Sequence, residues 1–389
     1  MPPAEDRLKL LLVVHRIDEQ AGMEVQLTHL ASGLAQRGHF VRLASLRSPT
    51  SADLATKVVP MDPRVQVLHF GARGRTAGVG SLRRLARLAR WSDLVHCTGW
   101  DASLWGRLAA VAAGRPVVVT EHTPGREHQV SSSGAPRKTL IEWHTRLLDP
   151  FTSVTVLCAE WQREMLRREG VAPQKMLCIP NGVPVNLLRA RADQGVSRAD
   201  LGIPAAAKVV VHVARFAPQK RQSLSLQTVA RLRESLGDVR IVFAGEGPEL
   251  DRVRQAAEAM NADWATFLGH HENVAAVLAM ADLAVLPSTG EALPMAILEA
   301  IAVGVPVVAS DVGDVGDMLR RTGAGLSVPA ADSAAFYDGC HQVLSNQSLH
   351  ERLSSAARAS AATMDAATMV ARYEELFGAV RAQPAPVLG

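Results

Sequence analysis

Short apolar runs rich in β-branched residues alternate with longer amphipathic segments along most of the chain. Runs of four to eight apolar residues are typical of buried strands, and apolar residues spaced three and four apart are typical of helices. Strands are predicted at 9–14, 40–45, 93–97, 116–120, 153–157, 176–179, 208–213, 239–244, 265–268, 282–286 and 306–309. Helices are predicted at 24–37, 102–113, 161–169, 222–236, 249–260, 272–280, 294–303 and 348–380. This alternation predicts an α/β protein whose parallel sheets are covered by helices on both faces.

The alternation is interrupted once, and the interruption divides the chain. Residues 182–207 are rich in polar residues, glycine and proline and have no sustained period. Two doubly wound, Rossmann-like domains are therefore predicted, at 1–185 and 186–365, followed by a C-terminal helix and tail at 366–389 that could pack back on the first domain. Ligands of such sheets bind at the carboxyl ends of the strands, so a cleft between the two facing domains is the expected site.

Composition excludes several classes of protein. The 389 residues are 48% hydrophobic and 21% charged, as in ordinary globular proteins. Aromatic residues make up 4%, which disfavours stacking on single-stranded nucleic acid. Four widely separated cysteines without a CxxC pair support neither a disulfide scaffold nor a zinc site.

Two segments bear on location. The N-terminus lacks the apolar stretch of a signal peptide. Residues 292–310 are almost apolar enough for a membrane span, but Glu299 lies near the centre and Gly304-Val305-Pro306 interrupts the run. Two buried elements and a cytoplasmic location are therefore expected.

Charge differs between the halves of the chain. Residues 1–180 carry 24 Lys/Arg and 16 Asp/Glu, whereas residues 181–389 carry 18 and 22. Much of the positive charge lies at 81–91 (SLRRLARLARW), which places leucines on one helical face and arginines around the other. Such a helix could lie on an anionic membrane. A surface helix packed on a sheet is the favoured interpretation, because the segment runs directly into the strand at 93–97.

The segment Gly290–Ala300 carries the most concentrated chemistry. Pro294 fits a first helical position, and the following helix is apolar on nearly every side. A carboxylate inside that helix, Glu299, needs hydroxyls or a cation to satisfy it. The helix N-terminus at Ala292, Leu293, Pro294 and Met295 would favour a phosphate, with Glu291 beside it. These residues fit a ligand site, and they equally fit a capped core helix with a buried ion pair.

The same segment resembles a family signature. Glu291-x7-Glu299, followed by the run 304–311 (GVPVVASD), is similar to the motif of family 4 retaining glycosyltransferases of the GT-B type. Four further segments match this family in order, at 179–183 (IPNGV), Arg215 with Lys220, 244–248 (AGEGP) and 267–269 (FLG). The N-terminal half matches more loosely, through Gly22, 38–39 and 120–122.

The resemblance implies a role for each matched residue. Arg215 and Lys220 are expected to bind the donor diphosphate and to stabilise the charge of the leaving group. Glu299 is expected to bind the ribose hydroxyls, and Glu291 those of the transferred sugar. The remaining implied contacts are the amides of 292–295 on phosphate, Gly245 and Gly247 as points of close approach to the nucleotide, Gly22 beside the diphosphate or acceptor, and His122 near the sugar and acceptor. The implied catalytic set is His122, Arg215, Lys220 and Glu291.

The chain departs from the family motifs at two places, and it lacks the motifs of nicotinamide-binding and metal-dependent enzymes. The family has paired glycines where this chain has Ala21-Gly22, and G-G-x-P-E where it has residues 313–317 (GDVGD). Leu250 occupies the third position of G-x-G-x-x-G, which removes the main support for a nicotinamide cofactor. The sequence contains no Asp-x-Asp triplet, so no catalytic metal and no cofactor besides the donor are predicted.

The predicted activity is transfer of a hexose or amino-hexose from a nucleotide sugar, expected to be UDP-linked, with retention of configuration. The expected acceptor is an aminocyclitol or aminoglycoside intermediate, because acids are predicted near the cleft at Asp18, Glu19, Glu24, Asp101, Glu121 and Glu127. A lipid or cell-envelope glycan acceptor, a nucleotide-sugar epimerase and a non-catalytic partner of a transferase are the alternatives. No nucleic-acid partner is expected, and the sequence does not determine the oligomeric state.

Overall fold

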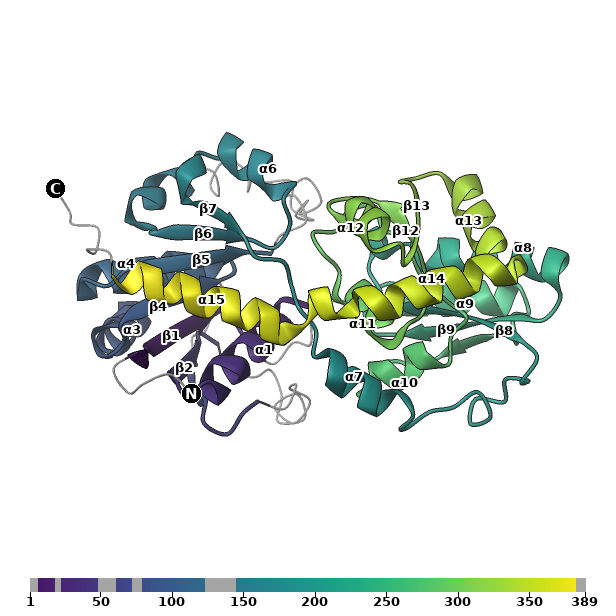
Figure 1. Cartoon of the computed structure of the whole chain (residues 1–389), viewed down its shortest axis with the longest axis horizontal. Coiled ribbons are helices and arrows are strands. Elements are labelled where there is room, and N and C mark those ends of the chain that lie inside the picture. The colour runs from purple at the N-terminus through teal and green to yellow at the C-terminus, as the bar shows by residue number, and fades with distance from the viewer. Residues whose placement is uncertain (1–5, 18–21, 48–60, 72–78, 123–144, 383–389) are drawn as a thin grey trace. The chain divides into compact units, whose positions relative to one another are not determined.

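A computed structural model describes residues 6–17, 22–47, 61–71, 79–122 and 145–382. The chain forms two compact units. The first comprises Met1–Asn181 and Ala366–Gly389, and the second comprises Gly182–Asp365. The chain therefore leaves the first unit once and returns to it with its last helix, drawn in yellow in Figure 1.

The first unit contains a seven-stranded parallel sheet in the order β3-β2-β1-β4-β5-β6-β7. Its strands are β1 (Lys9–Val14), β2 (Phe40–Ser45), β3 (Gln66–His69), β4 (Leu94–Thr98), β5 (Val117–Glu121), β6 (Val154–Leu157) and β7 (Met176–Cys178). Its helices include α1 (Gly22–Gln36), α3 (Val79–Trp91), α4 (Trp100–Ala113), α6 (Gln162–Arg168) and α15 (Ala366–Arg381).

The central strand β1 shows why this sheet is covered on both faces. Its alternate residues enter two different cores, because successive side chains of a strand point to opposite faces. Leu10 and Leu12 pack in one core with residues of α1 and α15. Leu11 and Val13 pack in the other core with residues of α3 and α4. The continuous apolar run of β1 therefore supplies buried side chains to the helix layers on both faces of the sheet.

The second unit contains a six-stranded parallel sheet in the order β10-β9-β8-β11-β12-β13. Its strands are β8 (Lys208–Val213), β9 (Val239–Ala244), β10 (Ala265–Phe267), β11 (Leu283–Leu286), β12 (Val307–Asp311) and β13 (Gly325–Pro329). Its helices include α7 (Val185–Ala192), α8 (Gln222–Leu236), α9 (Leu250–Ala259), α10 (Val274–Ala279), α11 (Met295–Val303), α12 (Val315–Thr322), α13 (Ser333–Ser345) and α14 (Gln347–Ser360).

The predicted fold class of two doubly wound parallel-sheet domains is confirmed. The sequence pattern missed β3 and β13, which are edge strands with largely exposed or half-buried residues and so lack an apolar run. The prediction of one continuous helix at 348–380 was wrong. It is divided into α14 and α15 by a turn of 3-10 helix at Ala361–Met364 and by extended backbone at Asp365.

The apolar segment 292–310 forms two short buried elements, as predicted. Helix α11 ends at Gly304, whose φ of 84° lies in the left-handed region that glycine adopts readily, and β12 follows. In the part of the chain that the structure describes, every helix is too short or too polar to cross a membrane.

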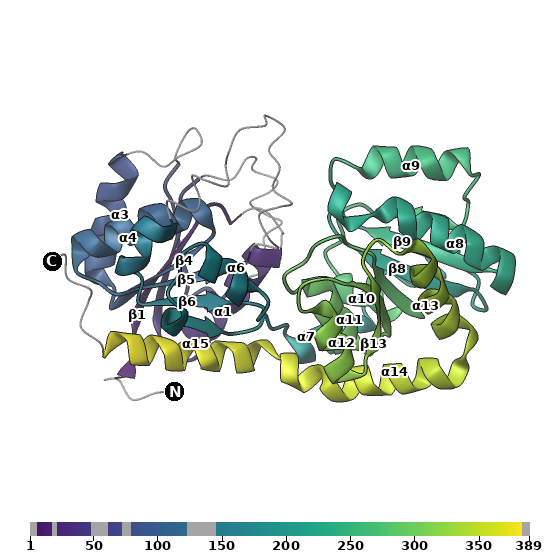
Figure 2. The ribbon, with the colours of Figure 1, turned by 90° about the horizontal axis from the view of Figure 1, so that it is seen from above.

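The last helix, α15, is part of the core of the first unit (Figure 2). Tyr373 and Phe377 are buried among side chains of the first sheet. At the surface, the carboxylate of Glu374 accepts from Arg37 at 2.5 Å and contacts Nε2 of the buried His39 at 2.8 Å. Both the burial of apolar side chains and the contacts of Glu374 therefore hold α15 on the first unit.

Candidate active site

The order of the strands predicts a ligand site at one edge of the second sheet. The winding direction reverses between β8 and β11, which are hydrogen-bonded neighbours. Loops that follow two such strands diverge and leave room at the carboxyl edge of the sheet. Arg215 and Lys220 follow β8, and Glu291 follows β11, so the predicted charged residues meet at this edge.

The loop that carries Arg215 is held firmly by its own backbone. The amide of Ala214 donates to Ala244 at 3.0 Å, and the amide of Phe216 donates to Glu246 at 2.8 Å. The Arg215 side chain is exposed. This loop therefore presents a solvated cation on a backbone that is fixed on both sides.

Gly245 and Gly247 take part in fixing that loop. A Cβ built on Gly245 would lie within 3.0 Å of the Ala214 carbonyl oxygen, and one on Gly247 within 3.0 Å of the Phe216 carbonyl oxygen. Real Cβ atoms almost never come so close. The family resemblance implies that these glycines allow close approach to a nucleotide. The structure gives them another physical reason, which is close approach to the backbone on either side of Arg215.

Lys220 and Glu291 form an ion pair across the edge of the sheet. Glu291 is buried, and the Lys220 side chain is 19% exposed. A backbone hydrogen bond of 2.9 Å from Thr289 to Gln219 joins the two loops beside this pair. Each charge therefore compensates the other at the position where the sequence predicts a diphosphate and a sugar.

Helix α11 supplies the remaining predicted groups of the second unit. The helix begins at Met295 and Pro294 is its N-cap, so the prediction of Pro294 as the first helical residue was wrong by one position. Pro294 has no amide proton, so the predicted amide cluster 292–295 cannot include it as a donor. Ala292, Leu293 and Met295 are buried in the same turn.

Glu299, in the second turn of α11, is partly buried. Desolvation raises the pKa of its carboxyl from 4.5 to about 7. In the described part of the chain it has neither a hydrogen-bond partner nor an ion-pair partner. A half-protonated carboxyl in that setting is suited to accept from, and donate to, ligand hydroxyls.

His122 and Gly22 belong to the first unit. His122 follows the carboxyl end of β5, and burial lowers the pKa of its imidazole to about 4, although the nearby Glu121 opposes the shift. The ring is therefore neutral at pH 7 and can accept a hydrogen bond from a hydroxyl. Gly22 is the exposed first residue of α1. Both residues thus lie at the edge of the first sheet where its strands end.

The structure describes some of the acids that are expected near the cleft. Asp18, Glu19 and Glu127 lie outside the described residues. Glu24 is a buried residue in the first turn of α1. Asp101 is paired with His15, whose Nδ1 lies 2.8 Å from the carboxylate. His15 directly follows β1, and that position was the only sequence signal for this pair.

The basic helix α3 is a surface helix packed on the first sheet. Leu85 and Ala89 are buried in the core that it shares with α4. Its arginines are exposed, and the Arg84 guanidinium lies 4.5 Å from the centre of the Phe70 ring. The apolar face of α3 is therefore used in the fold, and only the charged face remains accessible.

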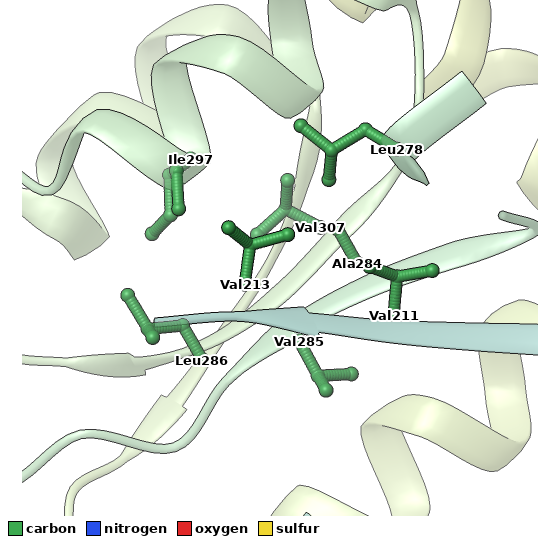
Figure 3. A pocket seen from close by; sticks show the side chains of 9 residues that line it. Val211, Val213, Leu278, Ala284, Val285, Leu286, Ile297 and Val307 are labelled. Atoms are coloured by element: carbon green, nitrogen blue, oxygen red, sulfur yellow. The ribbon is translucent and has the colours of Figure 1, made fainter. Parts of the chain in front are cut away.

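One pocket lies beside the candidate edge of the second unit, between its sheet and the helices α10 and α11 (Figure 3). All of the residues that line it are apolar: Val211, Val213, Leu278, Ala284, Val285, Leu286, Ala296, Ile297 and Val307. A diphosphate or a sugar needs polar partners, so this pocket is a gap in the apolar packing and not the predicted donor site. The residues that could bind the donor are on the loops that carry Arg215, Lys220 and Glu291.

Comparison with known proteins agrees with this arrangement. The family model described as "Glycosyl transferases group 1" matches residues 193–360, and the model "Glycosyltransferase Family 4" matches residues 21–187. The chain is 28% identical over 351 residues to a phosphatidyl-myo-inositol mannosyltransferase of Mycobacterium leprae, covering 88% of each protein. It is 29% identical to a D-inositol 3-phosphate glycosyltransferase of Geodermatophilus obscurus, covering 85% of this chain and 79% of that protein.

Solved structures show the same fold. HepE of Anabaena, in complex with UDP and glucose, superposes with a TM-score of 0.79 at 20% identity, covering 95% of this chain and 99% of HepE. A sucrose-phosphate synthase of Thermosynechococcus elongatus superposes with a TM-score of 0.78 at 21% identity, covering 96% of this chain and all of the synthase chain. The two sequence models together match most of the chain: the group 1 model lies within the second unit, and the family 4 model covers most of the first unit and extends to residue 187 of the second.

Proposed function

Because this chain belongs to glycosyltransferase family 4 and has the GT-B fold, we propose that it transfers a hexose or amino-hexose from a UDP-linked donor to a cyclitol hydroxyl. Transfer proceeds with retention and without a catalytic metal. The observation that carries the proposal is the meeting of Arg215, Lys220 and Glu291 at the β8–β11 edge. Two cations and a carboxylate at one edge match the charges of a diphosphate and the hydroxyls of a sugar.

The ion pair between Lys220 and Glu291 suggests how the donor is received. An incoming diphosphate competes with Glu291 for the Lys220 ammonium, and the released carboxylate can then accept hydrogen bonds from sugar hydroxyls. Arg215 and Lys220 stabilise the charge that develops on the leaving diphosphate. The leaving phosphate takes the acceptor proton on the same face, so no enzyme nucleophile is needed.

Two observations favour a cyclitol as the acceptor. The relatives described above are named for phosphatidyl-myo-inositol and inositol 3-phosphate, and inositol is a cyclitol. In the first unit, His15, Asp101 and His122 place hydrogen-bonding groups at the ends of β1, β4 and β5. We propose a small aminocyclitol, whose ammonium would suit the Asp101 carboxylate.

A lipid-linked acceptor is the second candidate. It is favoured by the exposed arginines of α3 and by the lipid in the name of the mycobacterial relative. Pelleting with anionic vesicles at low and high salt, together with product analysis on inositol lipids and on free cyclitols, separates the two candidates. Transfer to lipid alone would replace the small-acceptor proposal.

The experiment that tests the site uses Arg215→Ala and Lys220→Ala with a panel of nucleotide sugars and acceptors, read by mass spectrometry. Loss of one group that stabilises developing charge is expected to lower kcat by about 10²–10³-fold. Arg252→Ala is the matched control, since Arg252 is an exposed arginine of the same unit paired with Glu249. Unchanged transfer and donor hydrolysis in both site variants would refute the assignment.

A further inference from the structure

Gln222 has a buried side-chain amide that contacts the backbone of Arg215, the exposed cation of the candidate site. It is the first residue of α8 and is 2% exposed. Its Nε2 donates to the carbonyl oxygen of Arg215 at 2.9 Å. A buried glutamine loses solvation and side-chain entropy, so a defined hydrogen bond is needed to offset that cost.

The bond supports the loop at Arg215 itself. The amides on either side of Arg215, those of Ala214 and Phe216, are held by the β9 segment. The guanidinium of Arg215 forms neither a hydrogen bond nor an ion pair with the residues that the structure describes. The backbone therefore fixes the point at which the Arg215 side chain leaves the loop, and Gln222 holds the carbonyl of that same residue.

The path of the chain makes this contact possible. Arg221 adopts φ 53° and ψ 43°, a left-handed conformation that reverses the chain immediately before α8. The reversal brings Gln222, seven residues after Arg215, back beneath the loop. A non-glycine residue in this region is uncommon, so the loop closes on itself at some conformational cost.

We propose that Gln222 is a positioning residue that orients Arg215 toward the leaving diphosphate, an inference that rests on the proposed function. Catalytic groups fixed before the reaction need no reorganisation when charge develops. A misplacement of about 1 Å can lower turnover by about 10²-fold. Loss of the Gln222 amide should thus lower kcat more than it changes the donor KM.

The test begins with Gln222→Met and Gln222→Glu, each measured for kcat, donor KM and thermal unfolding. We expect Gln222→Met to lower kcat about tenfold or more with a small change in KM. A protonated glutamic acid can donate to the Arg215 carbonyl and a carboxylate cannot. The activity of Gln222→Glu relative to wild type should therefore rise as pH falls, whereas that of Gln222→Met should not. Gln227→Met is the matched control, because Gln227 is an exposed glutamine of the same helix.

A double-mutant cycle with Arg215→Ala separates positioning from general stability. If Gln222 acts through Arg215, then Gln222→Met costs little further activity in the Arg215→Ala background. Equal losses in both backgrounds, or a pH-independent Gln222→Glu, would overturn the inference. If Arg215→Ala itself has wild-type activity, the proposed function of the site fails as well. If Arg215→Ala is impaired while Gln222→Met is fully active, only the role of Gln222 fails.

Discussion

Replacement of Gly245 by alanine tests whether the loop around Arg215 depends on backbone contact. The added Cβ would meet the carbonyl oxygen of Ala214 within 3.0 Å. That carbonyl belongs to backbone next to the end of β8, so it cannot rotate aside as a flexible side chain would. Gly245 also has a φ of 139°, which side-chain-bearing residues rarely adopt.

Two energetic terms are expected to add. The backbone conformation costs about 1–3 kcal/mol for a residue with a Cβ. Overpacking against a fixed neighbour costs a further 1–3 kcal/mol or so. Gly237→Ala is the control, since Gly237 has a φ of 84° but no atom within 4 Å of its added Cβ. That control should carry the backbone term alone, about 1–3 kcal/mol, because Gly237 has a ψ of −128° and also lies in a region that side-chain-bearing residues rarely adopt.

Both glycines belong to the second unit, so their variants can be compared in the same unfolding transition. The assay is urea denaturation followed by far-ultraviolet circular dichroism, with transfer activity measured in parallel. We expect Gly245→Ala to be less stable than Gly237→Ala by about 1–3 kcal/mol and to lose activity. Equal stabilities, with full activity in Gly245→Ala, would refute the contact argument.

Three further variants test other parts of the structure. Glu374→Ala removes the carboxylate that Nε2 of His39 contacts at 2.8 Å and should lower the free energy of unfolding of the first unit by about 1–3 kcal/mol, measured by urea denaturation. Tyr373→Phe removes a buried hydrogen bond of 2.9 Å to Thr120 and should cost about 1–2 kcal/mol in the same assay; wild-type stability would contradict its importance. Glu299→Gln tests whether the pKa of the Glu299 carboxyl is raised to about 7 in the folded protein. Between pH 4.5 and 7 the folded protein keeps a proton on this carboxyl that the unfolded chain releases. The free energy of unfolding of the wild type should therefore fall as pH rises from about 4.5 to about 7. The glutamine variant should lack that component, and identical pH slopes would be the opposing result.

The architecture of each unit could be predicted from local patterns. Strands such as β1 and β8 are apolar because both of their faces are covered, and this property is written in consecutive residues. The edge strands β3 and β13 were missed because an edge position needs less apolar burial. The motif segments were found through their resemblance to a family signature, and most of them lie at or after the end of a strand.

By itself the sequence determined two parallel-sheet domains, their order and the residues that carry charge after each strand. Only the tertiary structure decided what those residues touch. Lys220 and Glu291 are 71 positions apart, and their pairing depends on β8 and β11 becoming neighbours. Gly245, which follows β9, is constrained by Ala214, which follows β8, and Glu374 is constrained by His39 at the opposite end of the chain. Periodicity records which face of an element is buried, whereas contacts between distant segments arise only when the sheets assemble.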